Sequence, residues 1–295
     1  MSHFEKVIFE LEARMSKDED AYQKYIDSLS FDPYRLEVET FQILSTIRYD
    51  PSLTSSIPQS VDEVSKFNFF LFKEHIARLR FTADYFTSAL KHEKLVDDLF
   101  PYEITEKHIL DQLKNALFES QVELYLPLKV RLLLKLDGEL KIELHETSLR
   151  PDLYDGLEND FPEEDQFDIY VYDTPILPSP FTSFKTTKRE AYNDARSKAL
   201  PGIRPGKEEV ILFNAINEVM EGSITNVAFR NDQGMWITPQ LTTGCLCGVT
   251  RNHLLQKNLI REGDITRSAL TLGQEVLLFN GIMGISRGII KGFIV

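Results

Sequence analysis

Apolar and polar residues repeat along the chain with two different periods, and each period predicts a different kind of element. Helical spacing of apolar positions predicts one or two amphipathic helices within residues 1–30 and helices within residues 94–120, with a break at Pro101. The clearest helix is expected over about residues 73–90. Its buried side would carry Ile76, Leu79, Ala83, Phe86 and Leu90.

The second period, strict alternation of apolar and polar residues, predicts β-strands. Residues 41–49 alternate in this way, and residues 124–136 alternate up to an Asp137-Gly138 turn, after which residues 140–144 alternate again. Asp-Gly between two alternating runs is a strong hairpin signal. The first half therefore predicts a strand, a helix and a β-hairpin.

An acidic stretch with glycine and proline, residues 150–165, separates the two halves. We expect a domain boundary there, with one domain over residues 1–158 and another over residues 164–295. Short strands with few helices follow, over residues 167–172, 209–213, 234–239 and 275–286, and a turn leads into another strand within residues 219–229. Many short strands predict a curved sheet or partial barrel.

Charge and cysteine content narrow the function classes. The 295 residues include 46 acidic and 33 basic side chains, a net charge of -13, which opposes binding to nucleic acid. No apolar run is long enough to span a membrane and no signal-peptide core is present, so we expect a cytoplasmic protein. Cys245 and Cys247 are the only cysteines, which predicts two reduced thiols and no metal site.

Lys185 is the first candidate for chemistry. It lies just ahead of a predicted helix, with Phe181 and Phe184 on one side and Lys188 and Arg189 on the other. An ordinary lysine has a pKa of about 10.4, so a nucleophilic lysine must be desolvated or placed near other cations. This flank offers both, although a solvated surface lysine has the same local pattern.

Two glycine loops and a glutamate are further candidates. Residues 244–251 place Gly244 and Gly248 ahead of Val249 and Thr250, whose amides would open a helix and attract an anion; residues 280–284 form a similar loop. Either loop could equally be a plain connection. Glu221, at the mouth of a strand, would be either a solvated turn residue or the partner of a protonated ring nitrogen.

Taken together, these stretches resemble the fold-type IV enzymes that use pyridoxal phosphate, a family of branched-chain aminotransferases, D-amino acid aminotransferases and aminodeoxychorismate lyases. The phrases Phe-Thr-Ser-Phe-Lys-Thr-Thr, Met-Glu-Gly-Ser-Ile-Thr-Asn, Thr-Gly-Cys-Leu-Cys-Gly and Leu-Leu-Phe-Asn-Gly are similar to those of the fungal lyases. The resemblance implies an α+β fold of two domains: a smaller N-terminal α/β sandwich, here with an unrelated N-terminal extension, and a C-terminal pseudo-barrel with flanking helices.

The resemblance also implies roles for individual residues. Lys185 would bond to the cofactor and later move a proton, and Glu221 would bind the pyridine nitrogen. The phosphate would be held by Arg78 and by the amides of Val249, Thr250 and Ile282, while Arg48 would meet a substrate carboxylate. The family's aminotransferases place a tyrosine five residues after the lysine, but here Glu190 stands at that position and the tyrosine is Tyr192.

The implied reaction converts 4-amino-4-deoxychorismate to 4-aminobenzoate and pyruvate, a step of folate synthesis, and family members usually form homodimers. An aminotransferase would share every cofactor contact and remains the alternative enzyme. A non-catalytic protein on an enzyme fold is a third possibility, which the presence of Lys185, Glu221 and Arg78 opposes.

Overall fold

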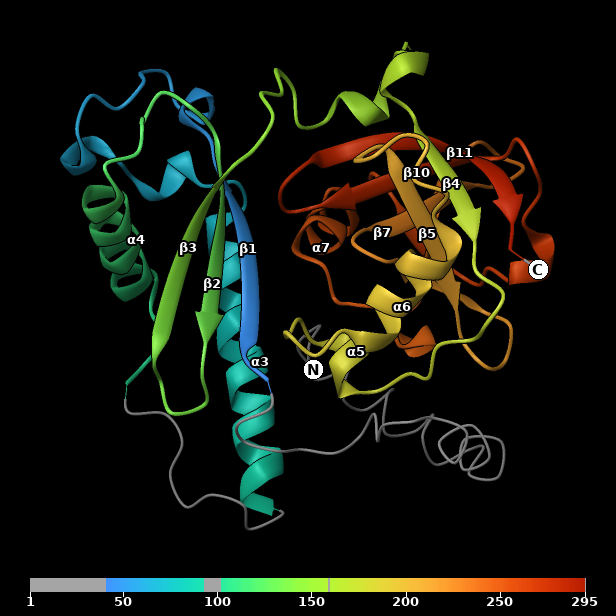
Figure 1. The fold of residues 1–295 in the computed structure, drawn as a ribbon, viewed down its shortest axis with the longest axis horizontal. Helices are drawn as coiled ribbons and strands as arrows, with labels where there is room; N and C mark the ends of the chain where they lie inside the picture. The colour runs from blue at the N-terminus through green and yellow to red at the C-terminus, as the bar shows by residue number, and fades with distance from the viewer. Residues whose placement is uncertain (1–40, 93–101, 159, 295) are drawn as a thin grey trace.

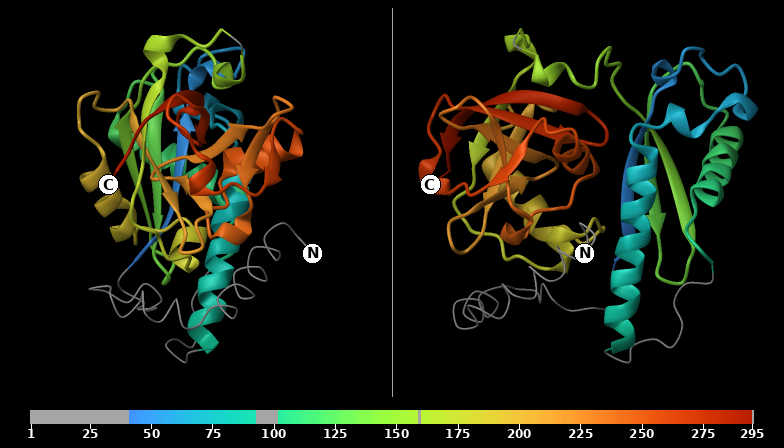
Figure 2. Two further views of the ribbon diagram at one scale, coloured as in Figure 1. Left: turned by 90° about the vertical axis from the view of Figure 1, so that its right-hand side faces the viewer. Right: turned by 180° about the vertical axis from the view of Figure 1, so that it is seen from behind.

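The computed structural model describes residues 41–92, 102–158 and 160–294. Two sheets lie side by side, and the chain crosses from one to the other at one end of the molecule (Figures 1 and 2). The helices predicted within residues 1–30 lie outside the described residues. The division at residues 158–164 stays a prediction, although the two sheets fall on either side of it.

The first sheet has three antiparallel strands, β1 (Ile43–Tyr49), β2 (Leu128–Leu134) and β3 (Leu140–Glu146), in that order. It packs with α3 (Phe72–His92) and α4 (Glu106–Ser120) around one apolar core. All five apolar residues predicted for the buried side of α3 are at most 2% exposed. The predicted hairpin is confirmed as β2 and β3. Short 3-10 turns precede α3 at Pro51–Leu53, Val61–Glu63 and Lys66–Asn68.

The second sheet has eight strands in the order β6-β5-β4-β11-β10-β7-β8-β9. They are β4 (Phe167–Val171), β5 (Glu208–Phe213), β6 (Val219–Gly222), β7 (Asn226–Arg230), β8 (Trp236–Pro239), β9 (Arg261–Gly263), β10 (Glu275–Asn280) and β11 (Gly284–Phe293). Only residues 223–225 separate β6 from β7, yet four strands lie between them in the sheet. The sheet must therefore curl back on itself, which confirms the predicted partial barrel. Residues 219–222, expected to be a turn, form the edge strand β6.

Helices around this sheet are α5 (Pro180–Ser183), α6 (Glu190–Ala199) and α7 (Val249–Gln256). Four 3-10 turns complete the elements, at Asp155–Leu157, Glu163–Asp165, Leu241–Thr243 and Arg267–Ala269. α6 and α7 begin where the sequence predicted helices. Their first turns face the space between the two sheets, because residues of both line the cavity described below.

The segment after α5 ties the two sheets together. The Leu44 amide donates to the Lys185 carbonyl at 2.9 Å, and the Thr187 amide donates to the Gln42 carbonyl at 2.9 Å. Phe181 and Phe184 belong to the apolar core of the first sheet, where the Phe181 ring stacks on Phe86 with centroids 5.5 Å apart. Lys185 is therefore fixed at the boundary between the two sheets.

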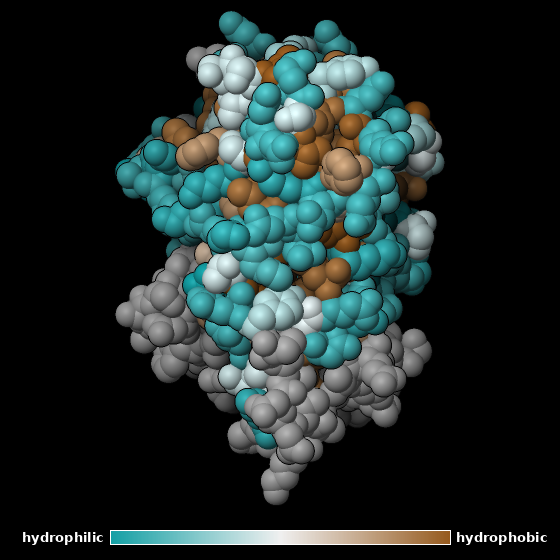
Figure 3. All heavy atoms as spheres, turned by 90° about the vertical axis from the view of Figure 1, so that its left-hand side faces the viewer, coloured by the Kyte–Doolittle hydropathy of each residue, from teal (hydrophilic) through white to brown (hydrophobic). Residues whose placement is uncertain are grey.

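The surface on the side of α4 and the turns before α3 is mainly hydrophilic, with scattered apolar side chains (Figure 3). Phe67 and Phe118 are the most exposed large apolar residues of α4 and the loops before α3. Among the described residues, no helix combines the length and apolar character needed to cross a membrane.

Candidate active site

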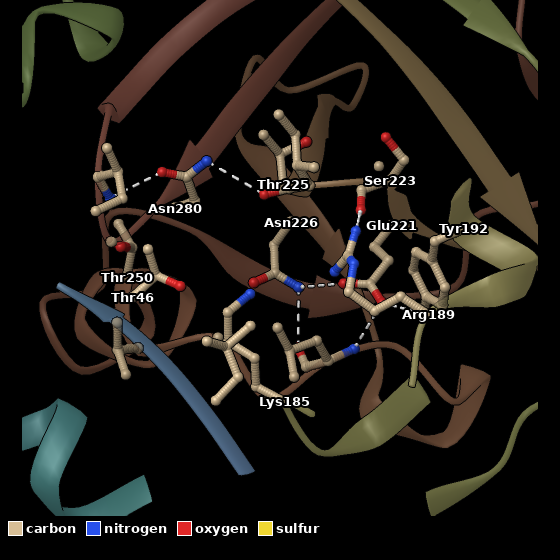
Figure 4. A pocket seen from close by; sticks show the side chains of 18 of the residues that line it. Thr46, Lys185, Arg189, Tyr192, Glu221, Ser223, Thr225, Asn226, Thr250 and Asn280 are labelled. Atoms are coloured by element: carbon tan, nitrogen blue, oxygen red, sulfur yellow. Dashed lines mark hydrogen bonds between the residues drawn. The ribbon is translucent and has the colours of Figure 1, made fainter. Parts of the chain in front are cut away.

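A cavity of about 590 Å³ lies between the two sheets and gathers most of the predicted site residues (Figure 4). Residues from β1, β2 and α3 line one side of it, and residues from the second sheet and its helices line the other. The predicted site residues in its wall are Lys185, Arg78, Glu221, Val249, Thr250 and Ile282.

Lys185 has the electrostatic setting that a nucleophilic lysine needs. Burial and the neighbouring guanidinium groups of Arg189 and Arg78 together lower its pKa to about 7, against the opposite effect of Glu221. No carboxylate among the described residues forms an ion pair with it. A substantial fraction of Lys185 is therefore a neutral amine at neutral pH.

Glu221 is held in a fixed orientation within β6. Its Oε1 accepts hydrogen bonds from the Tyr192 hydroxyl at 2.7 Å and the Leu246 amide at 3.1 Å, and its Oε2 accepts one from Asn226 Nδ2 at 3.2 Å (Figure 4). Burial raises the pKa of Glu221 to about 7, against the opposing effect of the hydrogen bonds from Tyr192 and Leu246. Oε2 has capacity for another donor, such as a protonated ring nitrogen.

Unpaired donors near α3 and α7 form an anion site. Arg78 is 5% exposed and lines the cavity, and no carboxylate of the described residues pairs with it. Thr250 Oγ1 and His75 Nε2, from the same wall, are buried without a hydrogen-bond partner. The α7 N-terminus adds backbone amides at Val249 and Thr250. Three unsatisfied groups and a helix end together fit a phosphate ester.

The neutral state of His75 follows from its surroundings. Burial lowers its pKa well below the usual value, and Arg78 and Lys185 act in the same direction. Its Nδ1 lies 2.9 Å from Ser45 Oγ. If the Ser45 hydroxyl donates to Nδ1, the ring carries its proton on Nε2, toward the anion site. Sequence reasoning missed His75, although it stands three residues before Arg78, one helical turn away.

The structure does not place Arg48 in the cavity wall, so its predicted substrate contact is corrected. Arg48 is 1% exposed and its Nε pairs with Asp50 Oδ2 at 2.7 Å. Its two terminal nitrogens donate to the carbonyls of Ile282 at 3.3 Å and Ser148 at 3.0 Å. All three guanidinium nitrogens are therefore engaged by the protein, and the side chain lies buried outside the cavity wall.

Ile282 lines the cavity, but its amide, which the resemblance assigned to the phosphate, already has a partner. Asn280 Oδ1 accepts from the amides of both Ile282 and Met283, at 2.9 Å each. A phosphate oxygen at this loop would share those amides with Asn280 or displace its side chain.

Cations dominate the rest of the wall. Among the residues that the structure describes, Glu221 is the only carboxylate that lines the cavity, against six lysines and arginines: Arg78, Lys129, Arg131, Lys185, Arg189 and Arg196. Arg131 and Arg196 also pair with carboxylates behind the wall, Glu143 and Glu209, at 2.7 and 3.0 Å. In a chain with a net charge of -13, this concentration of positive charge indicates an anionic ligand. In the sequence, Lys129 and Arg131 were visible as charged positions in the alternating pattern of β2.

Comparisons with known proteins agree with this geometry. The model of the class IV aminotransferase family matches residues 63–288. The aminodeoxychorismate lyase of Saccharomyces cerevisiae is 34% identical over 258 residues, which cover 76% of this chain and 68% of that protein.

Two solved structures share the fold. The branched-chain amino acid aminotransferase of Escherichia coli has a TM-score of 0.59 at 17% identity, covering 86% of this chain and 77% of that one. A Legionella pneumophila protein provisionally assigned as a 4-amino-4-deoxychorismate lyase has a TM-score of 0.56 at 15% identity, covering 85% and 82%. The α+β fold with a partial barrel that the resemblance implied is confirmed, and the chain belongs to the class IV aminotransferase family, with the yeast lyase among its relatives.

Proposed function

We propose that this protein is a pyridoxal phosphate-dependent lyase that converts 4-amino-4-deoxychorismate to 4-aminobenzoate and pyruvate. The observation that carries the proposal is the composition of the cavity wall: a lysine with a pKa of about 7 and one buried glutamate among cations. The similarity to the yeast lyase supports the same reaction. The substrate has one amine and two carboxylates, which match one reactive lysine and an excess of positive charge.

The alternative reaction is that of a branched-chain or D-amino acid aminotransferase, and the wall argues against the first of these. A branched-chain aminotransferase needs an apolar pocket for its substrate's side chain. Here Lys129, Arg131, Arg189 and Arg196 stand around the space beside Lys185. Arg131 and Arg196 already pair with Glu143 and Glu209, but Lys129 and Arg189 pair with no carboxylate of the described residues. An apolar substrate would leave these two cations without a counter-charge, whereas a dicarboxylate would neutralise them.

The cofactor would be held by residues already in place. Arg78, Thr250 and the first amides of α7 would bind its phosphate, and Glu221 would accept a hydrogen bond from its ring nitrogen. Tyr192, Asn226 and the Leu246 amide keep the Glu221 carboxylate facing the cavity. When bound, the cofactor would accept the electron pair left on the substrate's C4 as its proton departs.

Lys185 would move the proton. As a neutral amine it takes the proton from C4 of the substrate, and the C3–O bond to the enolpyruvyl group breaks as the ring becomes aromatic. The protonated Lys185 can then return that proton to the departing enolpyruvate, which becomes pyruvate. The atoms of the two products equal those of the substrate, so no water or other reactant is consumed.

The test is product formation by the full chain supplied with pyridoxal phosphate and freshly made aminodeoxychorismate. We expect fluorescent 4-aminobenzoate and pyruvate in equal amounts, and neither product from Lys185→Ala. Wild-type protein that binds the cofactor yet forms neither product, and instead transfers amino groups to 2-oxo acids, would replace the lyase with the aminotransferase.

Two expectations from the sequence remain part of this proposal. A cytoplasmic location suits an enzyme of small-molecule metabolism, and fractionation of cells would test it. Pairing of two chains, usual in this family, would be tested by sedimentation of the cofactor-bound protein. Activity of a monomer would not contradict the lyase proposal.

A further inference from the structure

Three successive carbonyls of the loop between β10 and β11 are held from outside the barrel. We call residues 280–283 the phosphate loop. The Gly281 carbonyl accepts from the Arg48 amide at 3.2 Å, and the Ile282 carbonyl accepts from Arg48 Nη1 at 3.3 Å. The Met283 carbonyl accepts from Arg150 Nη1. Arg48 belongs to β1 of the first sheet and Arg150 to the segment that joins the two sheets.

Because these carbonyls point toward the arginines, the backbone amides that follow them in the loop point the opposite way. In a trans peptide unit the C=O of one residue and the N–H of the next point in opposite directions. The amides of Ile282 and Met283 accordingly converge on one oxygen, Asn280 Oδ1, at 2.9 Å each. Asn280, Gly281, Ile282 and Met283 all line the cavity. Successive amides that meet at one point form an anion-binding concavity. Here the Asn280 side-chain oxygen fills it, and a phosphate oxygen would share the two amides with Asn280 or displace its side chain.

Arg48 and Arg150 can hold the loop carbonyls in fixed positions. The Arg48 guanidinium is buried, paired with Asp50, and bonded to the Ser148 carbonyl as well as to Ile282. Its planar fork therefore joins β1, the linking segment and the loop through three fixed directions. Arg150 adds bonds to the Ile285 carbonyl and to Asp155, so it fixes the loop's far end.

We propose that Arg48 and Arg150 are positioning residues that hold the phosphate loop in its anion-binding shape from outside the cavity. This inference rests on the proposed function, because it takes the cofactor phosphate as the anion. It replaces the substrate contact first expected of Arg48. Neither arginine would touch the cofactor; each acts through the loop's carbonyls. Docking of the first sheet would thereby complete a phosphate site on the second.

The matched control for Arg48 is Arg287. Arg287 is 5% exposed, pairs with Glu275 at 2.8 Å, and donates to the carbonyls of Gly156 and Glu158. It thus has a similar burial, an ion pair and two carbonyl partners, but none in the phosphate loop. Lysine keeps the positive charge at either position but lacks the planar guanidinium that bonds several partners at once. Arg48→Lys and Arg287→Lys should therefore lower the melting temperature by similar amounts.

The experiment measures the affinity of each full-length variant, freed of cofactor, for pyridoxal phosphate and for pyridoxal, which lacks the phosphate. We expect Arg48→Lys to raise the Kd for pyridoxal phosphate about tenfold or more and the Kd for pyridoxal less than about twofold. Arg287→Lys should leave both values within about twofold of wild type. If Arg48→Lys does not fold, Arg150→Lys carries the same expectation for the loop's far end.

Two outcomes would overturn the inference. Arg48→Lys and Arg287→Lys could behave alike, or Arg48→Lys could weaken both ligands equally, which would mean a general structural role. Failure of the proposed function looks different: wild type itself would then bind pyridoxal phosphate no more tightly than pyridoxal.

Discussion

The Tyr192 hydroxyl donates a 2.7 Å hydrogen bond to Glu221 Oε1 inside the protein, where both residues are at most 6% exposed. Tyr192 comes from the face of α6 that packs on the barrel, and Glu221 from the edge strand β6. The bond therefore ties the helix after Lys185 to the carboxylate proposed for the ring nitrogen. The pKa of Tyr192 is raised well above its usual value by burial and by Glu221, so Tyr192 stays a donor.

Tyr192→Phe should shift the titration of Glu221 upward. A donor to the charged form lowers a carboxyl pKa, and removing it raises the pKa above its present value of about 7. We expect the cofactor's bound absorbance to change with pH at a higher midpoint than in wild type. The lost buried hydrogen bond should also cost about 1–1.5 kcal/mol of unfolding free energy.

Tyr172→Phe is the control for that change. The Tyr172 hydroxyl donates to Asp194 at 3.3 Å, and Tyr172 does not line the cavity. Its loss should leave the spectral midpoint where it is. If both variants keep the wild-type spectral midpoint, the hydrogen bond from Tyr192 does not lower the pKa of Glu221.

Local pattern predicted the parts of the site that lie close together in sequence. The phrase around Lys185 includes the apolar flank and the Arg189 cation that lower its pKa, and the structure has both. The glycines before Val249 predicted a helix N-terminus, and α7 begins at Val249. These features depend on spacing within one or two turns of chain, which the sequence displays directly.

Contacts between distant residues could not be predicted in this way. The family resemblance implied that Arg48, an arginine at a strand end of a net-acidic chain, meets a substrate carboxylate. Its partners Ser148 and Ile282 are 100 and 234 residues away, and only the packing of the two sheets brings them to it. The Glu221 strand was read as a turn for a related reason, since a four-residue edge strand owes its form to its neighbour β5.

Lys185 should destabilise the cofactor-free protein below neutral pH. Its pKa is about 7 when folded and 10.5 ordinarily, so between these values the unfolded chain binds more protons and stability rises with pH. Below pH 7 both forms are protonated and the full penalty is present. Lys185→Met should therefore stabilise the chain at pH 6 by about 1–3 kcal/mol, allowing for partial solvent screening, with the gain fading by about pH 10.

Thermal unfolding of the cofactor-free variants at pH 6, 8 and 10 would measure this effect. Lys188→Met is the control, because the Lys188 ammonium lies 4.5 Å from the Phe181 ring centroid and outside the cavity lining. It should give no gain at any pH. A Lys185→Met variant that is less stable than wild type at pH 6 would contradict the assigned desolvation.

Lys129 should bind a substrate carboxylate. It lines the cavity from β2, and no carboxylate of the described residues pairs with it. Lys129→Met should raise KM for aminodeoxychorismate about tenfold, the worth of one charged hydrogen bond, with little change in melting temperature. Lys141→Met, which removes a lysine of β3 paired with Glu143 outside the cavity, should leave KM unchanged. Equal KM values for both variants would remove Lys129 from the substrate site.

Gly281→Ala should disturb the phosphate loop through one close contact. A Cβ at this position would lie 2.7 Å from His75 Nε2 and 3.2 Å from the Thr46 carbonyl oxygen. His75 is 1% exposed and bonded to Ser45, so its ring has little room to yield. The loop would have to move away, at a cost of about 1–3 kcal/mol in stability, with weaker binding of pyridoxal phosphate but not of pyridoxal.

A second substitution tests whether that contact is the cause. His75→Ala in the Gly281→Ala background removes the ring that the new methyl group would meet, so the double variant should recover part of the lost affinity relative to additivity. Gly292→Ala is the steric control, because its Cβ would approach no atom more closely than 3.3 Å, in the Tyr170 ring. If the losses of binding free energy caused by His75→Ala and Gly281→Ala are additive, the two residues act independently. In that case the close packing of α3 on the phosphate loop does not govern cofactor binding.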